Sequence, residues 1–176
     1  MKFVRRILAS TQLRMMALVA MLPMLCAFQS NGAEVPSTEY LVKAAFVYNI
    51  AQFVDWPAGA FSRTDAPIIV GLFESDPFGA AVALSIQNKT AKGRRFTVRH
   101  LGVESAVVES EVRDCHIVVV SASEARRFDK LVKAIDGAPV LTVGESDGFA
   151  RNGGIINLVL ENGKIFLEVN PEVSSR

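Results

Sequence analysis

The sequence has few of the side chains that build catalytic and metal sites. Its 176 residues include two histidines and two cysteines. No GxGxxG or GxxxxGK[ST] sequence occurs, so the common phosphate-binding loops are absent. Gly144-Glu-Ser-Asp-Gly148 matches the spacing of GxSxG, but the chain has only two histidines to act as a base for such a serine. Cys115 and His116 are adjacent, and in a strand they would point to opposite faces and could not bind one metal ion. We therefore expect a protein that is not an enzyme and has no cofactor.

The sequence also lacks an excess of either charge. It has 19 Lys and Arg residues against 18 Asp and Glu residues. Four of the bases and none of the acids lie in the first 33 residues, so the remainder has 15 bases and 18 acids. Because no basic surface is left to attract phosphates, we expect no nucleic-acid partner.

The N-terminus has the pattern of a secretory signal peptide. Residues 1–14 carry only basic charges, and residues 15–28 are apolar apart from the thiol of Cys26. This apolar run is about half a membrane span, which disfavours a permanent anchor. Leu25 before Cys26 disfavours a lipoprotein, since small residues are needed there. We predict cleavage after Ala33, a single domain over residues 34–176, and a periplasmic location.

Export leaves Cys115 as the one cysteine of the mature chain, so no internal disulfide can form. Cys115 begins a β-branched run and is predicted to be buried as a small apolar side chain. An intermolecular disulfide is the alternative.

The stretch from Tyr40 to Pro57 is predicted to be a helix that ends at Asp55-Trp56-Pro57. Twelve of the fifteen residues from Tyr40 to Val54 are apolar, and the exceptions, Lys43, Asn49 and Gln52, share no face. A helix that is apolar on all sides must be covered on all sides. We predict that a second copy covers part of it in a homodimer, at Phe46, Ile50 and Phe53. The alternative is that the loop at residues 58–66 and the C-terminal hairpin cover this face.

The rest of the chain alternates strand and helix patterns, which favours a parallel sheet with helices on both faces. Three continuous apolar runs predict buried strands, Asp76 precedes a helix as its cap, and Asn162-Gly163 predicts a hairpin. We predict a three-layer, Rossmann-like α/β domain with a mostly parallel sheet and a C-terminal antiparallel hairpin. The predicted strands are residues 67–73, 96–101, 115–121, 139–144, 155–160 and 164–169, and the later helices are residues 78–87, 103–112 and 124–135.

Ligands of open α/β sheets bind beyond the carboxyl ends of the strands. Asp76, Ser121 and Gly148 follow predicted strands, and a small-molecule site near them is one hypothesis. The loop from Gly144 to Gly154 has two interpretations. Its glycines suffice for turns before the hairpin, or it presents Phe149, Arg151 and Asn152 to another protein.

Several blocks of sequence together resemble the YfiR family (YfiR/HmsC-like) of small periplasmic regulators, over most of Tyr40 to Asn170. In order, these blocks are YLVKAAFVYNIAQFVDWP, GLFESDPFG, CHIVVVS, VLTVGESDGFARNGG and IINLVLENGKIFLEVN. The resemblance implies a homodimer that represses an inner-membrane diguanylate cyclase by binding its periplasmic sensory domain. It also implies an outer-membrane lipoprotein that sequesters the repressor, with effects on cyclic di-GMP and biofilm formation.

The sequence departs from that family in two places. Relatives often have cystine bridges, for which this chain lacks the cysteines. Relatives also continue into a C-terminal helix, which is missing here because the sequence ends at Pro171-Glu-Val-Ser-Ser-Arg176.

Overall fold

The computed structural model describes residues 36–73, 76–102 and 110–174. Contacts divide the chain into Met1–Glu34 and Val35–Arg176, and all described residues belong to the second unit. The predicted signal peptide therefore lies outside the described residues, as does most of the helix predicted over residues 103–112. In the part that is described, no helix is long and apolar enough to cross a membrane.

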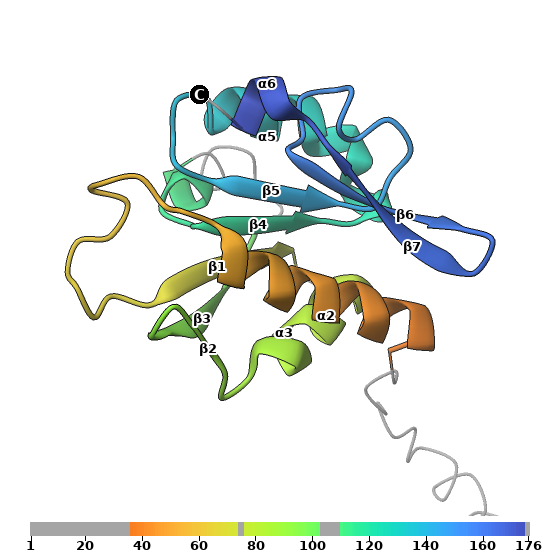
Figure 1. The fold of residues 1–176 in the computed structure, drawn as a ribbon. Helices are drawn as coiled ribbons and strands as arrows, with labels where there is room; N and C mark the ends of the chain where they lie inside the picture. The colour runs from red at the N-terminus through yellow and green to blue at the C-terminus, as the bar shows by residue number, and fades with distance from the viewer. Residues whose placement is uncertain (1–35, 74–75, 103–109, 175–176) are drawn as a thin grey trace, which may run out of the picture. The chain divides into compact units, whose positions relative to one another are not determined.

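A seven-stranded sheet forms the centre of this unit, in the order β2-β3-β1-β4-β5-β6-β7 (Figure 1). Its inner neighbours are parallel, which confirms the mostly parallel sheet. The five strands concerned are β1 (Ile68–Phe73), β3 (Arg94–Leu101), β4 (Ile117–Val120), β5 (Leu141–Gly144) and β6 (Ile156–Glu161). Numbered by their order in the chain, they lie in the order 2-1-3-4-5, which is typical of doubly wound α/β sheets.

The two edge strands are antiparallel to their neighbours. β7 (Lys164–Val169) forms the predicted hairpin with β6, and its turn residues Asn162 and Gly163 have φ values of 50° and 74°. Both φ values are positive, as a type I′ turn requires. The other edge is β2 (Thr90–Ala91), a short strand that the sequence analysis did not predict.

Two apolar cores lie on opposite faces of the sheet. In β4, Ile117 and Val119 belong to one core while Val118 and Val120 belong to the other, as the alternation of side chains along a strand requires. Helices α2 (Thr38–Phe53) and α3 (Pro77–Ile86) cover the first core, and α5 (Phe128–Ala134) covers the second (Figure 1).

Local signals explain where most of these helices begin and end. The side chain of Ser37 accepts a hydrogen bond from the N–H of Tyr40 and caps α2, and Val54 is already extended, ahead of Pro57. The predicted helix over residues 124–135 differs in detail. It begins as the 3-10 helix η2 (Ala122–Arg127) without a side-chain cap and becomes α-helical at Phe128. A further short helix, α6 (Pro171–Ser174), follows β7.

Candidate partner-binding surface

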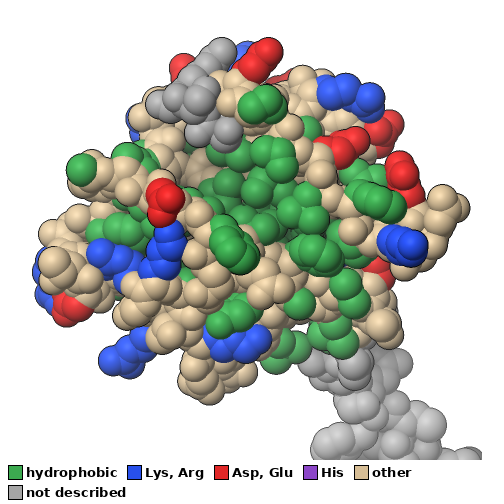
Figure 2. Space-filling view, viewed as in Figure 1, with side chains coloured by type: hydrophobic (Ala, Val, Ile, Leu, Met, Phe, Trp, Pro, Cys, Tyr) green, Lys and Arg blue, Asp and Glu red, His purple; other side chains and the backbone are tan. Residues whose placement is uncertain are grey.

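An apolar groove lies between the end of α2 and the last two strands of the sheet. Its cavity has a volume of about 660 Å³. Figure 2 shows hydrophobic side chains gathered around a hollow on this face. Most of the lining is apolar, so the groove fits another apolar surface better than a charged ligand. The apolar residues that line it are Val54, Trp56, Pro57, Ala58, Ala60, Ala138, Pro139, Val140, Leu141, Ile155, Ile156, Val169 and Val173.

Large apolar side chains next to this groove are exposed to solvent. Phe53, at the end of α2, is 82% exposed, and Leu167 and Val169 of β7 are exposed as well. A large apolar side chain left fully in water forgoes roughly 1.5 to 3 kcal/mol relative to full burial, and of these three Phe53 comes nearest to that limit. Contiguous exposed apolar surface of this kind typically marks an interaction site.

The three residues predicted to form the dimer interface differ in their surroundings. Phe46 and Ile50 are partly buried and pack against the protein's own core. The domain itself therefore covers part of both side chains, because α2 contacts both α3 and the unpredicted strand β2, and their place in a dimer interface stays a prediction. Phe53 is the member of this set that remains exposed. The homodimer itself stays a prediction.

Phe149, the predicted aromatic contact for a partner, is 1% exposed. Its ring stacks at a tilt on Phe128 of α5, with 4.3 Å between the ring centroids. A Cβ atom on Gly144 would come within 2.4 Å of this ring, and one on Gly154 within 2.2 Å. The prediction that the loop presents Phe149 on the surface is wrong, because glycines on either side of the loop make room for the ring in the core.

Arg151 and Asn152, the other two predicted contact residues, are exposed. The guanidinium group of Arg151 lies 3.0 Å from the carboxylate of Asp147, and the N–H of Asn152 donates to the carbonyl of Gly148. Both side chains are accessible to a partner.

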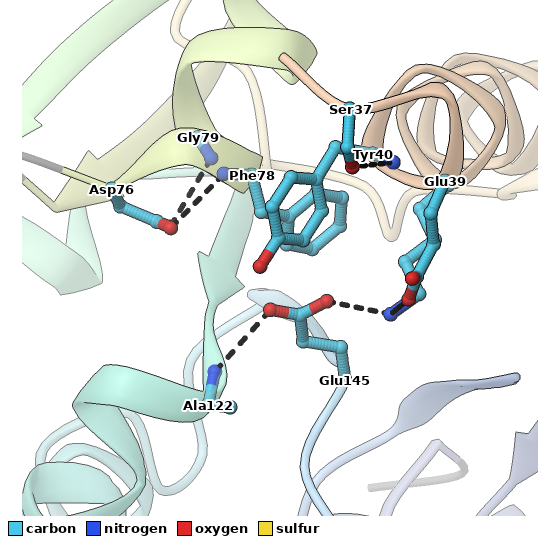
Figure 3. Close-up of polar contacts among 9 residues, drawn as sticks. Ser37, Glu39, Tyr40, Asp76, Phe78, Gly79, Ala122 and Glu145 are labelled. Carbon is cyan, nitrogen blue, oxygen red and sulfur yellow. Dashed lines mark hydrogen bonds and ion pairs between the residues drawn. The ribbon is translucent and has the colours of Figure 1, made fainter. Parts of the chain in front are cut away.

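A buried ion pair joins α2 to the loop after β5 (Figure 3). The Nζ atom of Lys43 lies 2.7 Å from Glu145 Oε2 and 2.6 Å from Glu39 Oε1. Glu145 Oε1 also accepts a 3.4 Å hydrogen bond from the N–H of Ala122. Burial by itself would lower the pKa of Lys43, but hydrogen bonds from Lys43 to Glu145 and Glu39 outweigh it and raise the pKa. The sequence analysis did not predict this ion pair. Its signal in the sequence was Lys43, the single cation of the apolar stretch from Tyr40 to Val54.

The polar residues at the carboxyl ends of β1 and β4 bond to the protein itself. The Asp76 carboxylate accepts hydrogen bonds of 3.1 Å from the N–H groups of Phe78 and Gly79, which confirms it as the cap of α3 (Figure 3). Burial raises the pKa of Asp76, although these two bonds and one from Ser121 oppose the rise. Ser121 Oγ also lies 2.8 Å from Ser123 Oγ. These groups therefore serve local structure at the position where the sequence suggested a small-molecule site.

His116 is buried in an aromatic cluster at the other end of the strands. Its Nδ1 accepts a 3.1 Å hydrogen bond from the N–H of Ile69, so Nε2 carries the proton and donates to the carbonyl of Ala60 at 3.0 Å. The imidazole stacks on Phe61 with 4.3 Å between centroids. Burial lowers the pKa of His116. A neutral imidazole with both nitrogens bonded is structural.

Cys115 is buried, as predicted, and its thiol is free. The Sγ atom lies 3.3 Å from the carbonyl oxygen of Glu111, and burial raises the pKa of the thiol to about 11. A buried, protonated thiol is poorly placed for an intermolecular disulfide. Within the described ranges, no group of three or more His, Cys, Asp or Glu side chains is arranged to hold a metal ion.

A family model described as YfiR/HmsC-like matches residues 40–176, from α2 through α6. The chain belongs to the YfiR/HmsC-like family. The resemblance inferred from the separate sequence blocks is thereby confirmed, and it covers the whole sheet of this YfiR/HmsC-like domain. Membership suggests a periplasmic regulator of cyclic di-GMP signalling. A comparison with curated proteins finds no match.

Proposed function

We propose that this protein is a non-catalytic periplasmic regulator that binds the periplasmic sensory domain of an inner-membrane diguanylate cyclase and represses it. Repression lowers cyclic di-GMP and biofilm formation. The regulator acts as a homodimer, and an outer-membrane lipoprotein sequesters it and releases the cyclase. The strand order described above also supports the Rossmann-like description of the domain.

The apolar groove is the observation that carries this proposal. A regulator of this kind works by protein contact, and the groove combines a cavity of about 660 Å³ with the exposed side chains of Phe53, Leu167 and Val169. Aromatic and apolar side chains that become fully desolvated supply most of the affinity of protein interfaces. We assign the cyclase to this groove, with Phe53 as its central contact and Arg151 and Asn152 as further contacts outside it.

The titratable groups of the described residues support a non-catalytic role. Asp76 caps a helix, His116 has both ring nitrogens bonded, and Lys43 and Glu145 neutralise each other. A general acid or base needs a reactive group within reach of a substrate. Each of these groups is instead used to hold the fold together.

The test uses two matched variants of exposed apolar residues. Phe53→Glu places a charge beside the groove, whereas Leu84→Glu places one on α3, where Leu84 is 57% exposed and does not line the groove. The full chain is produced in a bacterium together with the tagged cyclase encoded nearest to its gene. We expect wild type and Leu84→Glu to co-purify with the cyclase and to lower cyclic di-GMP, and Phe53→Glu to do neither. Equal binding by Phe53→Glu and wild type would remove the groove from the proposal, and a wild type without effect on cyclic di-GMP would refute the function.

A periplasmic small-molecule binding module is the second candidate. The groove volume lies within the range of about 300 to 1,000 Å³ that is usual for ligand pockets. In this hypothesis the ligand binds in the groove, and not in the crevice near Asp76, Ser121 and Gly148 where the sequence analysis placed it. Titration calorimetry with amino acids and vitamins decides it. Saturable heat that is lost in a Val169→Glu variant favours the module, because Val169 lines the cavity.

A further inference from the structure

Strand β7 has an open edge. It is the last strand of the sheet, and among the described residues none pairs with its outer side. The two-residue turn makes Glu161 and Lys164 a hydrogen-bonded pair, and hydrogen-bonded pairs recur at every second residue of an antiparallel ladder. Lys164, Phe166 and Glu168 therefore bond to β6. The N–H and C=O groups of Ile165, Leu167 and Val169 point toward the open edge.

This edge has few of the features that usually protect edge strands. Such strands are commonly very short, bulged, or interrupted by proline or by charged side chains, and of these β7 has only the charges of Lys164 and Glu168. β7 has six residues, contains no proline and pairs with β6 without interruption along its whole length. Phe166 is 49% exposed, and Leu167 and Val169 are exposed too. An edge of this kind is a template for pairing with another strand.

The sequence of β7 is complementary to itself when two copies run antiparallel about Phe166. Lys164 then lies opposite Glu168 of the second copy, Ile165 lies opposite Leu167, and Phe166 lies opposite Phe166. The two ion pairs, the apolar pairs and the aromatic pair are all favourable cross-strand combinations. In this register each odd-numbered residue of one β7 strand lies opposite an odd-numbered residue of the other. The outward N–H and C=O groups of the two strands therefore face each other.

Neighbouring registers lose this match. Hydrogen bonds between the two copies form only where residues with outward N–H and C=O groups lie opposite each other. The register can therefore shift only in steps that keep odd-numbered residues opposite odd-numbered residues. One such shift places Phe166 opposite Glu168, and the other places Phe166 opposite Lys164. Either shift breaks the ion pairs and sets the aromatic ring against a charge. Charge complementarity therefore selects the register centred on Phe166.

We propose that β7 is a homodimerisation strand, through which two copies join their sheets about a two-fold axis at Phe166. An axis of this kind is perpendicular to the sheet, so the two apolar grooves lie on the same side of the joined sheet. This pairing uses a surface different from the α2 residues considered above. It does not depend on the proposed repression of a cyclase, because a wild type that represses the cyclase as a monomer would overturn the pairing alone.

The decisive experiment reverses the charges one at a time in the full chain. Lys164→Glu places two acids opposite each other at both ends of the paired segment, and Glu168→Lys places two bases there. Each single variant is expected to weaken the dimer by at least about tenfold, since like charges directly opposite are repulsive. The double variant is expected to restore the wild-type dimer, as measured by light scattering and sedimentation.

A mixture of the two single variants is the most specific test. A Lys164→Glu chain pairs its two acids with the two bases of a Glu168→Lys chain, so the mixture is expected to form heterodimers that neither variant forms with itself. The mixture also controls for folding, because Glu168→Lys loses a 3.0 Å hydrogen bond from Asn157. Native mass spectrometry resolves the heterodimer from either homodimer. A mixture without heterodimer, or single variants as dimeric as wild type, would overturn the proposal.

Cross-linking provides an independent measurement. Phe166 and its counterpart form a non-hydrogen-bonded pair, in which the Cα atoms are about 4.5 Å apart and within reach of a disulfide. Phe166→Cys is expected to form a reducible dimer under mild oxidation. Leu160→Cys is the matched control, because Leu160 is 45% exposed on β6, away from the edge. Equal cross-linking by both variants, or a wild type that is monomeric at every concentration tested, contradicts the pairing. In that case the outer edge of β7 either stays unpaired or binds an extended segment of a different protein.

Discussion

The ammonium group of Lys43 lies 2.7 Å from the carboxylate of Glu145, although the two residues are 102 positions apart in the sequence. Each side chain is 5% exposed. The contact fixes the middle of α2 to the loop that follows β5. Removing one partner would leave an unpaired charge in a site that water reaches poorly.

We predict that Lys43→Met lowers the free energy of unfolding by about 3 kcal/mol, the lower end of the range for broken buried pairs. The double variant Lys43→Met, Glu145→Leu should recover most of the loss. Lys92→Met is the control, because its ion pair with Asp55 is exposed to solvent and such pairs contribute little to stability. Urea denaturation measures all four proteins. Equal losses for Lys43→Met and Lys92→Met would show that burial does not matter here.

Asp76 should respond differently to two substitutions. Asn is as good a helix cap as Asp and stays neutral, whereas Ala removes the cap at a cost of about 1 kcal/mol. Because burial raises the pKa of Asp76, its ionisation weakens the fold as pH rises through the folded-state pKa. Asp76→Asn should therefore be at least as stable as wild type at neutral pH, and its advantage should disappear below the ordinary pKa of 3.8. Thermal unfolding as a function of pH tests this, and a constant difference at all pH values would contradict it.

His116 should make the protein sensitive to mild acid. Because burial lowers its folded-state pKa below the ordinary 6.5, the unfolded chain takes up a proton first as pH falls. Its contribution to stability is present above pH 6.5 and is lost as pH falls from there toward the folded-state pKa. We expect the midpoint of thermal unfolding to fall in this window for wild type and for His100→Gln, whose side chain is exposed. A His116→Gln variant should show a smaller fall, and an equal fall in both variants would exclude His116 as the cause.

Gly154→Ala should destabilise the second core. The new methyl group would meet the Phe149 ring at 2.2 Å, and overpacking of this kind typically costs about 1 to 3 kcal/mol. Gly102→Ala is the control, since among the described residues other than its chain neighbour no heavy atom lies within 4 Å of its Cβ position. Chemical denaturation compares the two variants. If they are equally stable, Phe149 moves more freely than its burial indicates.

Cys115 should resist thiol reagents in the folded protein. Its pKa of about 11 leaves little of the nucleophilic thiolate near neutral pH, and the side chain is buried. We expect Cys115 to react at the rate of unfolding, and quickly once urea unfolds the chain. Reaction of the native protein at the rate of a free thiol would show that the site opens readily.

The parts of the fold that were predicted correctly have local signals. Ile68–Phe73 and Ile117–Val120 are continuous apolar segments, and Leu141–Gly144 is interrupted only by Thr142, as a strand covered on both faces needs a run of this kind. The helix cap at Asp76 and the turn at Asn162-Gly163 each depend on interactions within a few residues of sequence. Short elements such as β2, with two residues, are too small to leave a pattern in the sequence.

The surface could be predicted only in part, because exposure depends on contacts between distant segments. Phe149 is flanked by Asp147, Gly148 and Arg151, a composition typical of exposed loops, yet its ring packs on Phe128. Phe46 was expected to need a second copy, but the domain covers part of it. The groove was not predicted, since its walls come from five separate stretches of the chain.

The contact between Lys43 and Glu145 also restricts how this protein can diverge during evolution. Losing either charge alone leaves the other one buried, whereas losing both removes the penalty. Relatives that keep the same packing of α2 should therefore carry either two opposite charges or two neutral side chains at these positions. Intermediates with a single charge should be rare, and the two positions should change together along the branches of the family tree.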